Sequence, residues 1–85
     1  MKIVYLPSFI RQFKTLEKDL QEEAFEKIEL FRNADNHKFL RVHKLKGRLA
    51  GRYSFSVNYK TRIVFSYISK DEAAFLDIGD HDVYR

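Results

Sequence analysis

The spacing of apolar residues changes once along this chain, from a helical period to a period of two, and this change constrains the fold. Between residues 9 and 31 apolar side chains recur every three or four positions, which places them on one face of a helix: Phe9, Phe13, Leu16, Leu20, Ala24, Ile28 and Phe31. After Gly51, apolar Tyr53, Phe55 and Val57 alternate with polar residues, which is typical of a strand with one buried face. The pattern predicts helices followed by a sheet, in an α+β arrangement.

The boundaries of the expected elements follow from turn formers and capping residues. Residues 1–6 are expected to form a strand that Pro7 ends, and Ser8 can cap the helix that follows. The helical stripe is expected to divide near Asp19, an N-cap candidate with Glu22 three residues later. Residues 39–42 should be extended, and residues 53–57, 62–68 and 73–78 should form an antiparallel three-stranded meander. The prediction is an N-terminal strand, a two-helix hairpin and a meander packed on the helices, with the second sheet face left for a partner or a ligand.

The length and composition limit what this fold can contain. At 85 residues the chain is expected to be a single domain, residues 1–85, and with no cysteine it can have neither a disulfide nor a thiolate zinc ligand. No apolar run approaches the roughly 18 residues of a membrane span. The N-terminus lacks the apolar stretch of a signal peptide, so a cytoplasmic location is expected. Three glycines form no phosphate-binding loop, and no cofactor is expected.

Positive charge is concentrated in the middle of the chain. The formal net charge is +4, but residues 36–70 contain nine Lys or Arg and no Asp or Glu. Such a segment projects a positive field that suits phosphate groups, which favours a polyanionic partner. The alternative interpretation is a solvated strand surface that lacks acids.

Few residues are suited to catalysis. The three histidines do not form a metal-binding motif, so no metal site is expected. His43 lies in the acid-free segment and His81 follows the last strand, and the topology of a meander can bring these two ends together. A histidine can act as a general acid or base, and Arg62, at the start of a predicted strand, can either hold a phosphate or extend to solvent. Among the tyrosines, Tyr84 is the candidate for stacking on a base.

Four segments together resemble one family of proteins. These segments are His43–Gly47, Leu49–Tyr53, Tyr59–Phe65 and Leu76–Tyr84. They resemble the RelE/ParE superfamily of toxins from type II toxin–antitoxin pairs, over nearly the whole chain. The ending from Gly79 to Tyr84 is more similar to the RNA-cleaving YafQ and YoeB branches, although Ser54–Lys60 lacks a further His and Asp that the YafQ branch carries.

The resemblance implies ribosome-dependent cleavage of mRNA without a metal. By position, His43 corresponds to the general base, Arg62 to the residue that steadies the scissile phosphate, His81 to the general acid and Tyr84 to the terminal aromatic. The residues expected to bind RNA are Arg41, Lys44, Lys46, Arg48, Arg52 and Lys60. The implied partners are a cognate antitoxin, in a heterotetramer or a similar complex, together with the ribosome and mRNA.

Two alternative functions stay open within the same superfamily. One is a ParE-like inhibitor of DNA gyrase, and the other is a catalytically weak relative that mainly binds its antitoxin. The motif around Leu45–Gly47 and the strand from Arg62 to Phe65 are shared with the branches that are not nucleases, so these motifs specify the fold more than the activity.

Overall fold

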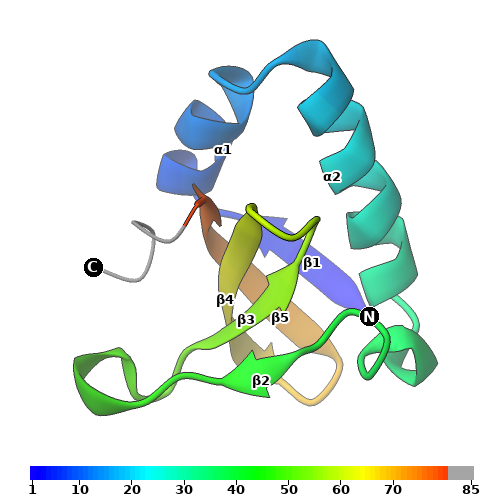
Figure 1. Cartoon of the computed structure of the whole chain (residues 1–85). Coiled ribbons are helices and arrows are strands. Elements are labelled where there is room, and N and C mark those ends of the chain that lie inside the picture. The colour runs from blue at the N-terminus through cyan, green and yellow to red at the C-terminus, as the bar shows by residue number, and fades with distance from the viewer. Residues whose placement is uncertain (81–85) are drawn as a thin grey trace.

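The computed structural model describes residues 1–80, in which two helices pack on one face of a five-stranded mixed sheet (Figure 1). The elements are β1 (Lys2–Tyr5), α1 (Pro7–Lys14), α2 (Lys18–Phe31), β2 (His43–Lys44), β3 (Tyr53–Ser56), β4 (Arg62–Ser69) and β5 (Glu72–Gly79), with short 3₁₀ turns η1 (Ala34–Asn36) and η2 (Gly47–Leu49). The sheet order is β1-β5-β4-β3-β2, with β1 parallel to β5 and every other pair antiparallel. The predicted α+β class, the N-terminal strand and the meander are confirmed, and β1 and β2 extend the meander at its two edges.

The predicted cap of the first helix is wrong. Leu6 occupies the N-cap position and Pro7 the first helical position, where a missing backbone N–H costs nothing. Ser8 therefore lies inside the first turn, and its hydroxyl donates instead to the carbonyl oxygen of Leu76 on β5, at 2.6 Å. The serine ties α1 to the sheet rather than capping the helix.

The helical stripe divides earlier than predicted. α1 ends at Lys14, where Thr15 donates both its backbone N–H and its hydroxyl to the Gln12 carbonyl. Glu17, not Asp19, is the N-cap of α2. Asp19 lies in the first turn, where its negative charge is favourable beside the positive end of the helix dipole.

The segment expected to be extended at residues 39–42 is a turn, and the strand β2 begins only at His43. Leu40 is nevertheless buried, and its carbonyl oxygen accepts a hydrogen bond from the Ser56 backbone N–H at 2.9 Å. The apolar pattern correctly predicted that Leu40 is buried. A residue in a turn can also have a buried side chain and a hydrogen-bonded carbonyl group, so burial here did not require a strand.

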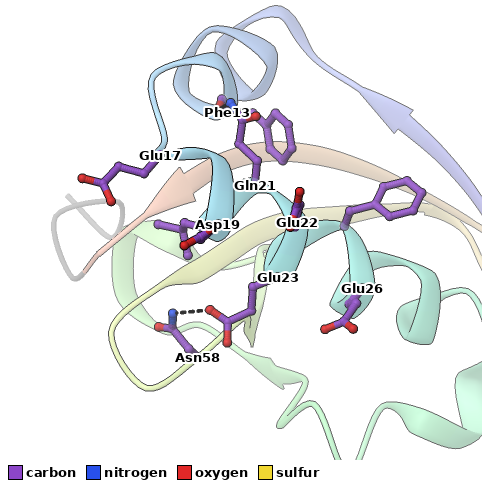
Figure 2. A pocket seen from close by; sticks show the side chains of 10 residues that line it. Phe13, Glu17, Asp19, Gln21, Glu22, Glu23, Glu26 and Asn58 are labelled. Carbon is purple, nitrogen blue, oxygen red and sulfur yellow. Dashed lines mark hydrogen bonds between the residues drawn. The ribbon is translucent and has the colours of Figure 1, made fainter.

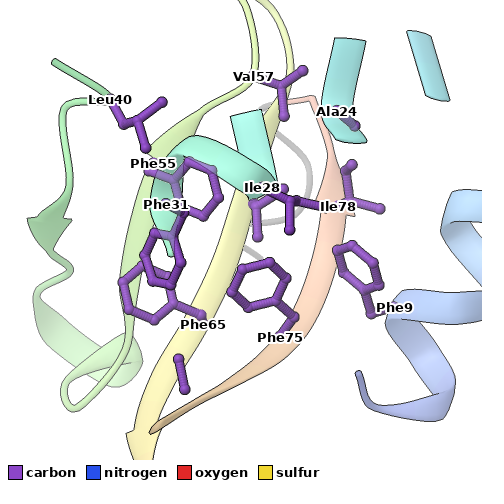
Figure 3. Close-up of a cluster of buried hydrophobic side chains, with 12 residues drawn as sticks. Phe9, Ala24, Ile28, Phe31, Leu40, Phe55, Val57, Phe65, Phe75 and Ile78 are labelled. Atoms are coloured by element: carbon purple, nitrogen blue, oxygen red, sulfur yellow. The ribbon is translucent and has the colours of Figure 1, made fainter. Parts of the chain in front are cut away.

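Aromatic rings form the core between the helices and the sheet (Figure 3). Phe31 of α2 stacks on Phe55, with ring centroids 4.8 Å apart, and meets Phe65 and Phe75 edge-on. All four rings are fully buried. Burial of one such side chain contributes about 1.5–3 kcal/mol, so this cluster fixes α2 on the sheet.

The second face of the sheet, turned away from this core, is not uniformly open. Ser54 was expected to face solvent, but it is fully buried, and so is Val64, its partner in register on β4. Ser56 and Arg62, the next pair along the same two strands, are half-buried. The second face thus becomes accessible toward the end of the sheet where β3 ends and β4 begins.

Candidate functional site

The strand register places two of the predicted catalytic residues on the second face. His43 lies opposite Ser54, Ser54 opposite Val64, and Ser56 opposite Arg62. Directly opposed residues project from the same face, and so do residues two apart along a strand. His43 and Arg62 therefore share one face, with their Cα atoms roughly 12 Å apart, because two strand spacings and two residues along the strand separate them.

Arg62 is held by backbone carbonyl groups of the turn that precedes it. Its Nη1 donates to the carbonyl oxygen of Asn58 at 2.6 Å and to that of Thr61 at 3.3 Å. Within residues 1–80, Nε and Nη2 make no hydrogen bond to a protein group. The guanidinium is thus fixed at one corner, and its Nε–Nη2 edge can bind two oxygens of a phosphate.

A cavity of about 380 Å³ lies beside this guanidinium. It is lined by Arg41, Ser56, Asn58, Tyr59 and Arg62. Two guanidinium groups, a hydroxyl and an exposed aromatic ring are a suitable set for a nucleotide, because the cations bind phosphate while a ring can stack on a base. We refer to this site as the basic cavity.

Arg41 enters the basic cavity from an unusual backbone conformation. Its φ is 60°, in the left-handed region that favours glycine. The Arg41 N–H donates to the Lys38 carbonyl and the Val42 N–H to the His37 carbonyl, which is the hydrogen-bond pattern of a helix C-cap normally completed by glycine. A left-handed arginine costs about 1–2 kcal/mol, and non-glycine residues in such conformations concentrate at functional sites.

His43 has the tautomer that a general base requires. Its Nδ1 lies 2.9 Å from the carbonyl oxygen of Arg41. A carbonyl oxygen only accepts, so Nδ1 carries the proton and the lone pair of the neutral ring is on Nε2. The side chain is exposed on the edge strand β2, so Nε2 is accessible to a substrate hydroxyl.

The residues predicted to bind RNA fall into three places. Arg41 lines the basic cavity, and Lys60 is exposed on the turn between β3 and β4. The other four are exposed at the end of β2 and in the connection to β3: Lys44, Lys46, Arg48 and Arg52. We call residues 44–52 the basic arm, which Figure 1 shows extending away from the helices. Lys44 is paired with Tyr53 and so projects from the sheet face opposite to that of His43.

The remaining two predicted catalytic residues, His81 and Tyr84, lie outside the described residues. The structure does show where the chain leaves the sheet, because Gly79 at the end of β5 is paired with Arg62. The convergence of His81 on His43 and Arg62 stays a prediction.

Three residues of the basic cavity were not predicted as functional, namely Ser56, Asn58 and Tyr59. Tyr59 is 84% exposed, and it had been considered only as one of several tyrosines. The available signal was the short connection between the predicted strands 53–57 and 62–68, because residues immediately before a functional arginine lie next to the arginine's ligand.

A larger depression of about 920 Å³ lies along α2, and Phe13 of α1 and Asn58 also line it (Figure 2). Five of its lining residues are acidic: Glu17, Asp19, Glu22, Glu23 and Glu26. We call it the acidic depression. Five carboxylates repel a polyanion, so this hollow is not suited to RNA despite its size. Its wall includes Asn58, which also lines the basic cavity.

An apolar groove adjoins the acidic depression. It has a volume of about 480 Å³ and is lined mainly by Tyr5, Phe9, Ile10, Phe13, Phe25 and Ile28. Phe25 is 60% exposed and Ile10 is 40% exposed. Burial raises the pKa of the Tyr5 phenol above its usual value, which favours the neutral ring that an apolar groove requires.

No metal site or membrane span was found among residues 1–80. No three His, Cys, Asp or Glu side chains in this range gather to hold a metal ion. None of the helices in the same range has the length and apolar character needed to cross a bilayer.

No family model matches the sequence, and no curated protein matches it either. Solved structures do match the fold. YafQ from E. coli superposes with a TM-score of 0.79 at 14% identity, covering 98% of this chain and 96% of that chain. The heterotetrameric YoeB–YefM toxin–antitoxin complex from Staphylococcus aureus gives 0.73 at 20% identity, covering 95% and 97%. The toxin–antitoxin complex RelBE2 from Mycobacterium tuberculosis gives 0.70 at 15% identity, covering 94% and 96%.

These similarities show that this chain has the same fold as the YafQ, YoeB–YefM and RelBE2 structures. YafQ, YoeB and RelE share it with this chain at sequence identities of 20% or less. The expected fold is confirmed, while the activity has to be argued from the residues of the site.

Proposed function

We propose that this protein is the toxin of a type II toxin–antitoxin pair and that it cleaves mRNA on the ribosome. The fold of toxins such as YafQ supports the toxin role. The cleavage activity is supported chiefly by one observation: His43 and Arg62 share a sheet face, and Arg62 lines a cavity that Arg41 also lines.

The reaction we propose is attack of a ribose 2′-hydroxyl on the adjacent phosphorus. His43 Nε2 removes the hydroxyl proton, the 2′-oxygen forms a bond to phosphorus, and the bond from phosphorus to the 5′-oxygen breaks. His81 donates a proton to the departing 5′-oxygen. The products are a 2′,3′-cyclic phosphate and a 5′-hydroxyl, and no co-reactant is consumed.

Arg41 and Arg62 have separate roles in this scheme. Arg62 is fixed by carbonyl groups, so its Nε–Nη2 edge, which has no hydrogen-bond partner among residues 1–80, is preorganised to stabilise the negative charge that builds on the phosphate oxygens. Arg41 lies in the same cavity and can bind a neighbouring phosphate. The cations of the basic arm would bind further phosphates of mRNA or ribosomal RNA.

The deciding experiment adds the purified protein to translating ribosomes and maps the mRNA ends. We expect cuts at codon boundaries that leave 5′-hydroxyl ends. His43→Ala and His81→Ala should each lower the cleavage rate by about 10²–10⁴, the usual contribution of acid–base catalysis. His37→Ala is the matched control, because His37 is stacked on Phe31 and bonded to its carbonyl, away from the basic cavity.

Two results would point to the alternative functions. Intact mRNA together with trapped gyrase–DNA breaks would indicate a ParE-like gyrase inhibitor. Intact mRNA without such breaks, but with tight binding of a protein encoded next to this one, would indicate a relative that only binds its antitoxin.

We propose an antitoxin as the protein partner and the cytoplasm, where ribosomes are, as the place of action. The neighbouring folds include toxins in complex with antitoxins, one of them heterotetrameric. The apolar groove, with exposed Ile10 and Phe25, suits an amphipathic segment of the partner. Phe25→Glu should weaken the complex in a pull-down, whereas Lys27→Glu, on the same helix and outside the groove, should not.

A further inference from the structure

Asn58 lies where the basic cavity and the acidic depression meet, and among residues 1–80 it is the one that lines both. Figure 2 shows its side-chain amide directed at Glu23 of α2. The residue belongs to the turn between β3 and β4, immediately before Arg62, so its position affects the predicted phosphate ligand directly.

The side-chain oxygen of Asn58 shapes this turn. Oδ1 accepts from the backbone N–H groups of Lys60 and Thr61, at 2.8 Å each. The Thr61 carbonyl in turn accepts from the Val57 N–H at 2.9 Å, which closes the turn from the backbone side. An asparagine that bonds the backbone two and three residues later fixes the local chain direction. Consequently it also fixes the Asn58 carbonyl, which accepts from Arg62 Nη1.

The side-chain nitrogen of Asn58 ties the turn to the helix. Nδ2 donates to Glu23 Oε1 at 2.9 Å, across 35 positions of sequence, and both residues are half-buried. Only one orientation of the amide satisfies all three contacts, because two N–H groups face the oxygen and a carboxylate faces the nitrogen. A hydrogen bond to a charged acceptor is stronger than a neutral one. Glu23 therefore holds the amide, the amide holds the turn, and the turn holds Arg62.

We propose that Asn58, braced by Glu23, is a positioning residue that presents the Nε–Nη2 edge of Arg62 to a phosphate of single-stranded RNA. The inference deepens the proposed function and rests on it for the identity of the ligand. Arginine is flexible when unsupported, so holding Nη1 on a fixed carbonyl lowers the entropy that Arg62 loses when it binds a phosphate.

Replacing Glu23 tests this inference, because an explanation by charge and an explanation by positioning predict opposite changes in RNA affinity. By charge alone, Glu23→Ala removes a negative group near the basic cavity and should strengthen RNA binding. By positioning, the same change releases the Asn58 amide and should weaken binding of a trinucleotide about fivefold, the loss of about 1 kcal/mol. Glu23→Gln retains an acceptor oxygen for the amide and should restore affinity to within about twofold.

Glu22→Ala is the matched control. Glu22 lies next to Glu23 on α2, lines the same depression and carries the same charge. Its removal should leave trinucleotide affinity unchanged or slightly higher. Thermal unfolding of each variant shows whether a loss of affinity comes from a loss of fold.

A second measurement shows how firmly the Arg62 guanidinium is held, and it needs no RNA. In ¹⁵N NMR, the Arg62 Nη1–H signals of the full chain should be protected from solvent exchange, because Nη1 donates to the Asn58 and Thr61 carbonyl groups. Glu23→Ala and Asn58→Asp should reduce this protection. Asn58→Asp retains the oxygen that the turn needs but puts a second carboxylate against Glu23. The Glu22→Ala protein should resemble the wild type.

The outcomes separate this inference from the proposed function. Unchanged Arg62 exchange together with unchanged or increased affinity in Glu23→Ala would overturn the positioning role, whatever the protein cleaves. Loss of protection and of trinucleotide affinity in that variant would support it even if the wild type leaves mRNA intact, in which case only the proposed cleavage fails. A wild type that binds no trinucleotide would overturn both.

Discussion

The basic cavity and the acidic depression are neighbouring hollows with opposite charge, separated by the Asn58 turn. The depression is the larger, at about 920 Å³ against about 380 Å³, yet its rim has five carboxylates while the cavity contains two guanidinium groups. For a polyanionic ligand the sign of the charge outweighs the volume, because each phosphate gains from the cations and is repelled by the acids. The smaller hollow is thus the better candidate for RNA.

The opposite charges come from different parts of the sequence. The acids of the depression lie between residues 17 and 26, in a region of nearly balanced charge. The charged residues of the basic cavity come from the segment 36–70, which contains no acid. The fold brings both segments to one turn without mixing them, so substitutions on each side should have separable effects.

The largest expected effect is that of Arg62→Ala on RNA cleavage. Loss of a preorganised donor to a developing oxyanion lowers rates by about 10²–10³. Arg62→Lys should recover only a small part, because an ammonium cannot bind two phosphate oxygens with a planar fork. The measurement is single-turnover cleavage of mRNA on ribosomes. Glu26→Ala, in the acidic depression, is the comparison variant and should cleave at the wild-type rate. Equal losses of cleavage rate in Arg62→Ala and Glu26→Ala would show that the basic cavity is no more important for cleavage than the acidic depression.

A smaller effect is expected from salt on binding of single-stranded RNA. Each phosphate contact adds about −0.7 to the slope of log affinity against log salt concentration. With about four contacts, affinity should fall about 50-fold between 50 mM and 200 mM salt. Removing two cations of the basic arm by Lys46→Ala and Arg48→Ala should make the slope shallower by about 1.4. Glu17→Ala and Glu22→Ala together should leave the slope as it is. A slope near zero for the wild type would show that the basic surface does not dock RNA.

The sequence allowed the order of the elements to be predicted, because the change of apolar period is a local signal. The strands β4 and β5 and the stripe that includes Phe31 were placed correctly. The errors occurred where a residue makes its contacts outside its own local element. Ser8 bonds a strand carbonyl instead of its own helix, and Leu40 is buried from a turn instead of a strand. Tertiary contacts determine these positions, and a local sequence pattern does not contain information about them.

The candidate site could be predicted only in part, because some of its features also depend on tertiary contacts. His43 and Arg62 were identified from their residue types and positions, and the register puts them on one face. No local pattern indicates a functional role for Asn58, because its bond to Glu23 links positions 35 residues apart. Arg41 was identified by its charge, while its left-handed backbone was not predicted, since glycine or asparagine is the usual signal for that conformation.

The smallest expected effect tests whether the strain at Arg41 serves the basic cavity. Arg41→Gly relieves the left-handed strain, partly offset by the greater freedom of glycine in the unfolded chain, so the free energy of unfolding should rise by about 0.5–1 kcal/mol. The same change removes one cation from the cavity and should weaken trinucleotide binding about fivefold. Arg41→Lys retains both the charge and the strain, so its stability should equal that of the wild type. Urea unfolding and trinucleotide titration of the three proteins check these values. If the glycine variant were more stable and bound RNA as tightly as the wild type, Arg41 would be an unfavourable residue with no role in the cavity, and the contrast between the two hollows would then depend on Arg62 alone.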